Sequence, residues 1–129
     1  MYAIGCDVGS QSLKGVLLDP DGRTVAQSSA AYPIDYPHPA WAQQDPRDWR
    51  RALATVVRGL LRDADVAPGD VATLGLATQV DGLAAVDGDG EALAPAIIWL
   101  DRRAATQSQA LRDRMDPARI RGLTGLNLD

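Results

Sequence analysis

Two short apolar runs close to the amino terminus, with a small polar segment between them, constrain the fold more than any other feature of the sequence. The runs cover residues 2–6 and 15–18, and residues 7–14 between them read Asp-Val-Gly-Ser-Gln-Ser-Leu-Lys. Short apolar runs of this kind are typical of strands, and a glycine between them favours a tight turn. We therefore predict two strands, at about residues 2–7 and 14–19, joined by a turn around Gly9.

The side chains in and beside this turn are suited to binding phosphate. Gly9 lets the backbone approach an anion closely, Lys14 adds a positive charge, and Asp7 is a hard oxygen ligand where Mg²⁺ would accompany nucleotide phosphates. The candidate phosphate-binding residues are Gly9, Ser10, Gln11, Ser12 and Lys14, and the candidate metal ligand is Asp7. The segment predicts ATP chemistry, although it matches neither the Walker pattern nor G-x-G-x-x-G. The same residues also fit a plain hairpin turn between two ordinary strands.

The composition indicates one globular domain and argues against several classes of partner. The 129 residues are 46% apolar, and their formal net charge is -4. An acidic chain lacks the basic surface that nucleic acids and anionic membranes attract, so we expect neither as a partner. The single cysteine, Cys6, lies within the first predicted strand, and no apolar stretch approaches the length of a membrane span. We therefore expect a cytoplasmic protein with a buried, unpaired Cys6.

Strands and helices do not alternate regularly in the middle of the chain. After a turn at 19–22, the predicted elements are a strand at 24–33, a loop at 32–40, a helix from Asp45 to about residue 65 and a strand at 72–78. Asp45 can cap this helix, and Pro46 occupies its first position. Three consecutive antiparallel strands before any helix differ from βαβ alternation. This order predicts an α/β domain with a mixed sheet, the ribonuclease-H-like fold of the actin-like ATPase superfamily.

The last third of the chain is predicted to be a mixture of short elements. These are strands at 83–86 and 95–99, a helix from about residue 100 to 115, and a second short helix that begins at Asp116 and Pro117. The turn at 87–90 is acidic, but the oxygen ligands of a calcium loop do not follow it. We therefore interpret that turn as part of a hairpin.

Four segments, in this order, resemble the FGGY family of carbohydrate kinases, and xylulose kinases in particular. The segments are the turn at 7–14, the Trp41–Trp49 region with the Pro37-His38-Pro39 loop before it, Gln79-Val80-Asp81-Gly82, and Ala96-Ile97-Ile98-Trp99-x-Asp101-x-Arg103. A looser fifth segment is Thr124-Gly125-Leu126. Each segment is weak alone, but together they span nearly the whole chain.

The resemblance implies a role for each matching residue. Asp7 would help to hold Mg²⁺, and residues 9–12 with Lys14 would face the β- and γ-phosphates of ATP. The residues implied on the sugar side are Gln79, Val80, Asp81, Trp99, Asp101 and Arg103. Asp81 stands where many xylulose kinases carry His. A carboxylate accepts hydrogen bonds from two adjacent hydroxyls, so Asp81 fits a polyol or ketose but puts xylulose itself in doubt.

Structural interpretations of the same residues stay open. Asp81 can be an ordinary turn residue before Gly82, Trp99 a core residue, and Asp101 a helix cap. For Trp41, Trp49 and the loop at 37–39 we favour a structural role. His38 has no partner that the sequence reveals.

The resemblance also implies what this chain lacks. Family members are several times longer and have two ribonuclease-H-like domains, with ATP and sugar between them. The general base, an aspartate, belongs to the second domain together with the adenine-binding motifs. We therefore expect the general base beyond Asp129, and we expect none of residues 1–129 to replace it.

It follows that residues 1–129 are expected to be the leading, incomplete part of a kinase for a sugar or polyol, a pentulose such as xylulose first among them. Alone, the chain would be inactive. Without its second domain it would also expose apolar surface, which favours aggregation or a homodimer.

A hypothesis from another class is a non-catalytic module, either a regulator or part of an actin-like ATPase. It would share the Asp-x-Gly turn, but it would leave the segments at 79–82 and 99–103 without a purpose.

Overall fold

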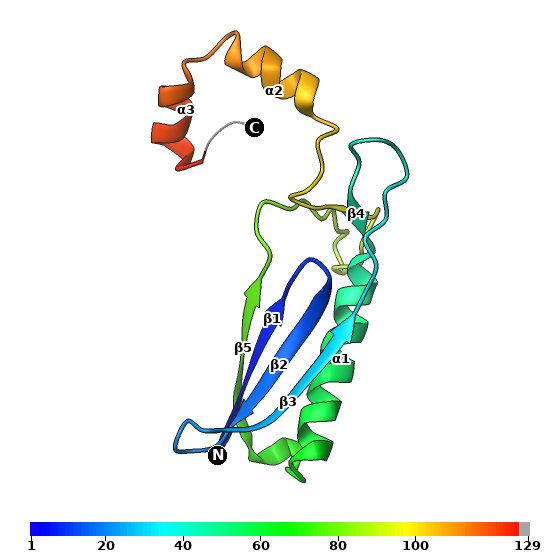
Figure 1. The fold of residues 1–129 in the computed structure, drawn as a ribbon, viewed down its shortest axis with the longest axis vertical. Coiled ribbons are helices and arrows are strands. Elements are labelled where there is room, and N and C mark those ends of the chain that lie inside the picture. The colour runs from blue at the N-terminus through cyan, green and yellow to red at the C-terminus, as the bar shows by residue number, and fades with distance from the viewer. Residues whose placement is uncertain (127–129) are drawn as a thin grey trace.

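The computed structural model describes residues 1–126, and a mixed four-stranded sheet forms its centre (Figure 1). The elements in chain order are β1 Tyr2–Val8, β2 Ser12–Leu18, β3 Thr24–Ala31, β4 Gln43–Gln44, α1 Pro46–Asp63, the 3-10 helix η1 Pro68–Asp70, β5 Val71–Thr78, β6 Ala96–Ile97, α2 Ala105–Arg112 and α3 Pro117–Thr124.

The four long strands lie in the order β3-β2-β1-β5. β1 pairs antiparallel with β2 and β2 with β3, whereas β5 pairs parallel with β1. The predicted antiparallel meander and mixed sheet are therefore confirmed. β3 ends two residues earlier than predicted, because Tyr32 leaves the ladder to contact the turn between β1 and β2.

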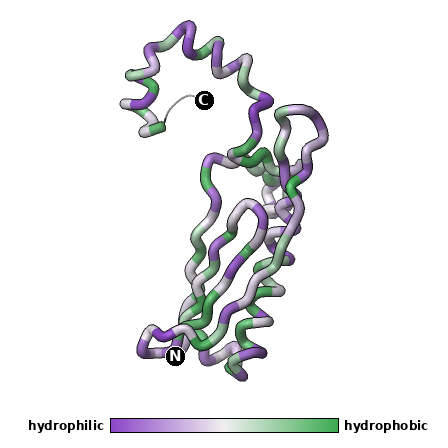
Figure 2. The backbone as a smooth tube through the Cα atoms, viewed as in Figure 1, coloured by the Kyte–Doolittle hydropathy of each residue, from purple (hydrophilic) through white to green (hydrophobic). Residues whose placement is uncertain are grey.

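Helix α1 covers one face of this sheet, and the core lies between them (Figure 1). Asp45 caps the helix by accepting a hydrogen bond from the N–H of Arg47, as the sequence predicts. The alternation of β1 and β2 turns apolar side chains toward α1. The core residues are Ile4, Cys6, Val8, Leu13, Leu17, Tyr32, Ala52, Val56 and Leu60. Figure 2 shows hydrophobic residues along this sheet and hydrophilic ones at the β2–β3 turn.

The helix approaches the sheet closely at two glycines. A Cβ on Gly15 of β2 would lie 2.5 Å from Cγ1 of Val56, and a Cβ on Gly59 of α1 would lie 2.7 Å from Oγ of Ser28. Both distances are too short for real side-chain contacts. The absence of a side chain at these positions therefore sets the distance between α1 and the sheet.

The region after β5 differs from the prediction in two places. Residues 83–86 do not form a strand: only single bridges join Leu83 to Ile97 and Val86 to Ala92. The predicted strand at 95–99 is reduced to β6, which pairs with β4, a strand that the sequence did not predict. The reason is that this segment pairs with short pieces of chain rather than with the main sheet.

The helix predicted from residue 100 begins only at Ala105. Asp101 does not cap it, because its carboxylate accepts hydrogen bonds from Ala42 and Arg103 instead. The second short helix begins at Pro117, as predicted, and Asp116 caps it. Figure 1 shows α2 and α3 standing apart from the sheet. None of the helices in the described part of the chain is both long and apolar enough to cross a bilayer.

Candidate functional site

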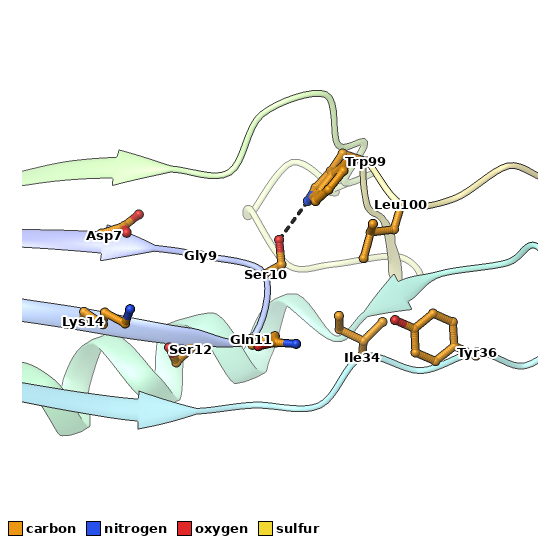
Figure 3. A pocket seen from close by; sticks show the side chains of 10 residues that line it. All are labelled: Asp7, Gly9, Ser10, Gln11, Ser12, Lys14, Ile34, Tyr36, Trp99 and Leu100. Atoms are coloured by element: carbon orange, nitrogen blue, oxygen red, sulfur yellow. Dashed lines mark hydrogen bonds between the residues drawn. The ribbon is translucent and has the colours of Figure 1, made fainter. Parts of the chain in front are cut away.

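The turn between β1 and β2 forms one wall of a pocket of about 360 Å³ at the end of the sheet (Figure 3). All the predicted phosphate-side residues line it. The lining residues are Asp7, Gly9, Ser10, Gln11, Ser12, Lys14, Ile34, Tyr36, Trp99 and Leu100.

Strand alternation places the two charged residues of this pocket on the sheet face opposite α1. Asp7 of β1 and Lys14 of β2 are register partners, and both are exposed while their neighbours in the strands are buried. Lys14 forms no ion pair with any residue in the described part of the chain. Its ammonium group is therefore available to an anion that enters the pocket.

The backbone of the turn has its carbonyl groups bound and two of its N–H groups free. The carbonyls of Gly9, Ser10 and Gln11 accept hydrogen bonds from the Tyr32 hydroxyl, Nε2 of Gln44 and the N–H of Tyr32, respectively. Within residues 1–126, no acceptor takes the N–H of Ser10 or Gln11. Successive free N–H groups in a turn form a concave site for an anion.

Hydrogen bonds of Tyr32 and Gly9 stabilise this geometry. Burial of Tyr32 raises the pKa of its hydroxyl, and the nearby charge of Asp7 raises it further, so the hydroxyl stays a donor at neutral pH. The N–H of Gly9 donates to the carbonyl of Ser12 over 3.0 Å. A Cβ on Gly9 would lie 3.2 Å from that same oxygen, so the tight turn favours glycine.

The segment after β5 lies beside the turn. The N–H of Gln79 donates to the carbonyl of Val8, and the hydroxyl of Ser10 donates to Oε1 of Gln79 over 3.3 Å. Asp81 has a φ of 59°, a left-handed conformation that Asp tolerates better than most residues. Val80 and Asp81 are exposed and line a shallow pocket with Gln79 and Trp99.

Trp99 joins the two halves of the site. Its indole N–H donates to Oγ of Ser10 over 2.8 Å, and its side chain is 46% exposed (Figure 3). Trp99 is therefore not a core residue, and the structural interpretation given for it above is wrong. A second depression of about 650 Å³ has Asp81, Trp99, Asp101 and Arg103 among its lining residues.

Asp101 and Arg103 are engaged within the protein. The Asp101 side chain is 3% exposed and forms an ion pair with Arg103 over 2.8 Å. Burial alone would raise the pKa of Asp101, but hydrogen bonds from the Arg103 side chain and from the N–H groups of Ala42 and Arg103 lower it below its usual value. The guanidinium of Arg103 also lies 3.8 Å from the ring centroid of Trp41, and His38 packs against that ring edge to face.

The structure therefore brings all the predicted phosphate-side and sugar-side residues into one region, and it adds two that the sequence did not single out. Gln44 is 2% exposed, and Tyr32 is 8% exposed. Gln44 lies within a segment that carries the family resemblance, but a glutamine gives no local sign of a distant partner. Tyr32 belongs to a stretch that the sequence predicts only as a loop.

The expected position of the general base is a separate matter. We predicted this aspartate beyond Asp129, and Asp129 itself lies outside the described residues 1–126. The absence of a general base from this chain therefore stays a prediction.

The donors and charges fit the phosphates of a nucleotide. Free N–H groups and Lys14 match phosphate oxygens, and the carboxylate of Asp7 is the acidic group that lines the same pocket. No group of three His, Cys, Asp or Glu residues within residues 1–126 could enclose a metal. A single carboxylate still fits Mg²⁺, because that ion keeps several waters and takes other ligands from the phosphates.

Comparisons with known proteins agree with this geometry. Residues 2–129 match the FGGY family of carbohydrate kinases, N-terminal domain. A glycerol kinase of Acidovorax ebreus is 36% identical over 130 aligned positions, which cover 99% of this chain and 26% of that protein. A xylulose kinase of Klebsiella pneumoniae is 36% identical over 119 residues, 92% of this chain and 24% of that protein.

Solved structures show the same fold. The gluconate kinase of Lactobacillus acidophilus superposes with a TM-score of 0.89 and 30% identity, covering 98% of this chain and 25% of that one. The predicted actin-like ATPase fold is thereby confirmed. The chain spans about a quarter of the length of these relatives. Because the family match extends from residue 2 to residue 129, this chain belongs to the FGGY family of carbohydrate kinases.

Proposed function

We propose that this chain is the phosphate- and sugar-contacting part of an enzyme that transfers the γ-phosphoryl group of ATP to a hydroxyl of a sugar or polyol. The observation that supports this most strongly is the position of Ser10. Its backbone N–H is free in the anion-binding turn, while its hydroxyl contacts both Gln79 and Trp99 on the sugar side. A phosphate and a sugar hydroxyl bound on either side of Ser10 would be neighbours.

ATP and Mg²⁺ fit the phosphate side of this site. Lys14 and the free N–H groups would hold the terminal phosphates, and Asp7 would orient water on Mg²⁺, which neutralises phosphate charge when bound. Phosphoryl transfer depends mainly on positioning and charge neutralisation, and these residues supply both. The general base and the adenine site would come from the part of a full-length kinase that follows Asp129, so residues 1–129 alone would bind phosphate but not turn over.

The sugar-side residues favour a small polyhydroxylated substrate. The relatives named above are kinases of glycerol, xylulose and gluconate. The exposed carboxylate of Asp81 and the partly exposed indole of Trp99 suit vicinal hydroxyls and sugar carbons, respectively. We place a pentulose such as xylulose first and a polyol such as glycerol second.

A chimera tests this function. The chain replaces the 119 matching residues of the Klebsiella xylulose kinase, and ADP release is measured with xylulose, glycerol and gluconate. We expect turnover with at least one of them, and none with residues 1–129 alone. A folded chimera that binds ATP but phosphorylates none of the three would overturn the proposal and favour a non-catalytic module.

A pair of matched variants tests whether Asp81 contacts the sugar. Asp81→His restores the residue that many xylulose kinases carry, and it should shift the preference of the chimera toward xylulose. Asp89→His makes the same change in the turn at 87–90, which lines none of the pockets described above, and should leave the preference unchanged.

A further inference from the structure

We propose that Gln44 is a positioning residue: together with Tyr32 it holds the anion-binding geometry of the turn at 9–11 and ties that turn to Gln79. The consequence for phosphoryl transfer rests on the function proposed above. The anion binding itself does not, and it can be tested separately.

The orientation of the Gln44 amide is fixed by its partners. The indole N–H of Trp49 can only donate, and it lies 3.2 Å from Oε1 of Gln44. The carbonyls of Ser10 and Pro33 can only accept, and they lie 2.7 and 3.0 Å from Nε2. A flipped amide would face an N–H with an N–H and two carbonyls with an oxygen. Gln44 therefore presents its donor to the turn in one orientation only.

Gln44 and Tyr32 together occupy three consecutive carbonyls of the turn. Nε2 of Gln44 donates to the carbonyl of Ser10. The hydroxyl and the N–H of Tyr32 donate to the carbonyls of Gly9 and Gln11, respectively. A carbonyl and the N–H of the next residue belong to one rigid peptide plane, so fixing the first fixes the second. Holding the carbonyls of Gly9 and Ser10 fixes the direction in which the N–H groups of Ser10 and Gln11 point.

The side chain of Gln44 also contacts the sugar side of the site. Oε1 of Gln44 also accepts a hydrogen bond from Nε2 of Gln79 over 3.0 Å, and Oε1 of Gln79 accepts the hydroxyl of Ser10. Gln44, Gln79 and Ser10 thus form a closed ring of hydrogen bonds from three separate segments. Within the described residues, no buried side-chain polar atom lacks a partner. Loss of the Nε2 donor of Gln44 would therefore release the turn, and loss of the whole amide would also release the Gln79 segment.

The test measures tripolyphosphate binding to the full chain by NMR, through the backbone amide signals of Ser10 and Gln11. Gln44→Glu keeps the shape but replaces the Nε2 donor with an acceptor, and we expect about tenfold weaker binding at pH 8. Tyr32→Phe removes only the bond to Gly9, and we expect about threefold weaker binding. Gln43→Glu is the control: it makes the same change next door, where the side chain contacts Asp35 and Arg103 and not the turn.

A pH series separates positioning from general loosening. The carboxyl introduced by Gln44→Glu is buried, so its pKa is raised, and once protonated it can donate to a carbonyl again. The ratio of its dissociation constant to that of the unmodified chain should fall from about ten at pH 8 to about two at pH 5. Tyr32→Phe should give a ratio that does not change with pH.

Each outcome decides the proposal. Ratios near one in both folded variants, an equal loss in Gln43→Glu, or a Gln44→Glu ratio independent of pH would overturn it. If Gln44→Glu does not fold, Tyr32→Phe alone decides. A pH-dependent loss in a chain whose chimera phosphorylates nothing would leave the positioning role standing and refute only the kinase. An active chimera whose activity does not change with Gln44→Glu would leave the proposed kinase standing and refute the positioning role.

Discussion

At the scale of single residues, Lys14 is the group on which phosphate binding should depend most. It is the only lysine of the chain, it is exposed in the pocket, and within residues 1–126 no carboxylate pairs with it. A charge-assisted hydrogen bond contributes about 1.5 to 3 kcal/mol, so Lys14→Met should weaken tripolyphosphate binding by about 10- to 100-fold. Titration of the chain by calorimetry measures this change.

The control removes an equal charge elsewhere. Arg23→Met deletes an exposed cation that pairs with Asp21 at the far turn, and it should leave binding nearly unchanged. Because Lys14 is the only lysine, ¹³C-dimethylation labels this side chain and the terminal amine alone, and methylation keeps the charge. An ε-methyl signal that does not move when tripolyphosphate is added would contradict the assignment of Lys14.

Asp101 should give the chain a specific sensitivity to acid. The pKa of its carboxyl is lower in the folded chain than in the unfolded chain, because its hydrogen bonds outweigh the effect of burial. Its contribution to stability is therefore present above about pH 4 and is lost as the pH falls through the folded-state pKa. Asp101→Asn should lower the free energy of unfolding by about 2 kcal/mol at pH 7 and by much less below pH 3.

Urea unfolding between pH 7 and pH 2.5 tests this difference. Asp21→Asn removes an exposed carboxylate of a surface ion pair and should have little effect at any pH. A constant gap between Asp101→Asn and the unmodified chain across this range would show that protonation of Asp101 does not contribute.

The sequence revealed residues whose role depends on local pattern and missed those that act over distance. Two apolar runs with a glycine between them were enough to expect Asp7 and Lys14 beside a turn at Gly9. By contrast, Gln44 contacts Ser10 and Gln79, which are 34 and 35 positions away along the chain. The side chain of Asp101 likewise reaches Ala42, 59 positions away. Such partners follow from the tertiary structure and not from the neighbouring residues.

At the scale of elements, the contact of α1 with β2 depends on Gly15. A Cβ there would lie 2.5 Å from Val56, 3.2 Å from Leu60 and 3.3 Å from Sγ of Cys6, all in the core. Overpacking of this kind costs about 1 to 3 kcal/mol, so Gly15→Ala should lower the free energy of unfolding by that amount. Gly75→Ala in β5 meets nothing within 4 Å and serves as the control. Equal stabilities of the two variants would mean that α1 is free to move away from the sheet.

Elements were predictable where one strong pattern decided them. The meander and α1 combine apolar runs with turn or cap signals, and the structure confirms them. The segment at 83–86 has the composition of a strand, yet it finds only single-residue bridges. The predicted start of the helix at residue 100 was wrong because Asp101 is used by the loop at 41–42 rather than by a helix end. Tertiary contacts override local propensity in both places.

At the scale of the whole molecule, the two edges of the sheet differ in character. Neither edge strand carries a charge, but β3 has Gln-Ser-Ser at its centre, whereas β5 reads Val-Ala-Thr-Leu-Gly-Leu-Ala-Thr and has only threonines as polar side chains. β5 has β1 on one side only, and every one of its residues after Val71 is exposed. An uncharged, apolar edge strand is a template for pairing with another chain. Self-association of this chain stays a prediction, and we expect it to occur at β5.

This placement predicts which substitution keeps the isolated chain monomeric. Leu76 of β5 is 54% exposed, close to the exposed Leu74, and a lysine there would set charge against charge in any β5–β5 contact. Light scattering across a range of concentrations should show association of the unmodified chain and much less of Leu76→Lys. Val25→Lys adds the same charge to an exposed position near the start of β3 and should not reduce association. A chain that stays monomeric without any substitution would contradict this prediction. A Val25→Lys variant that reduces association as much as Leu76→Lys would show that the chain does not associate through β5.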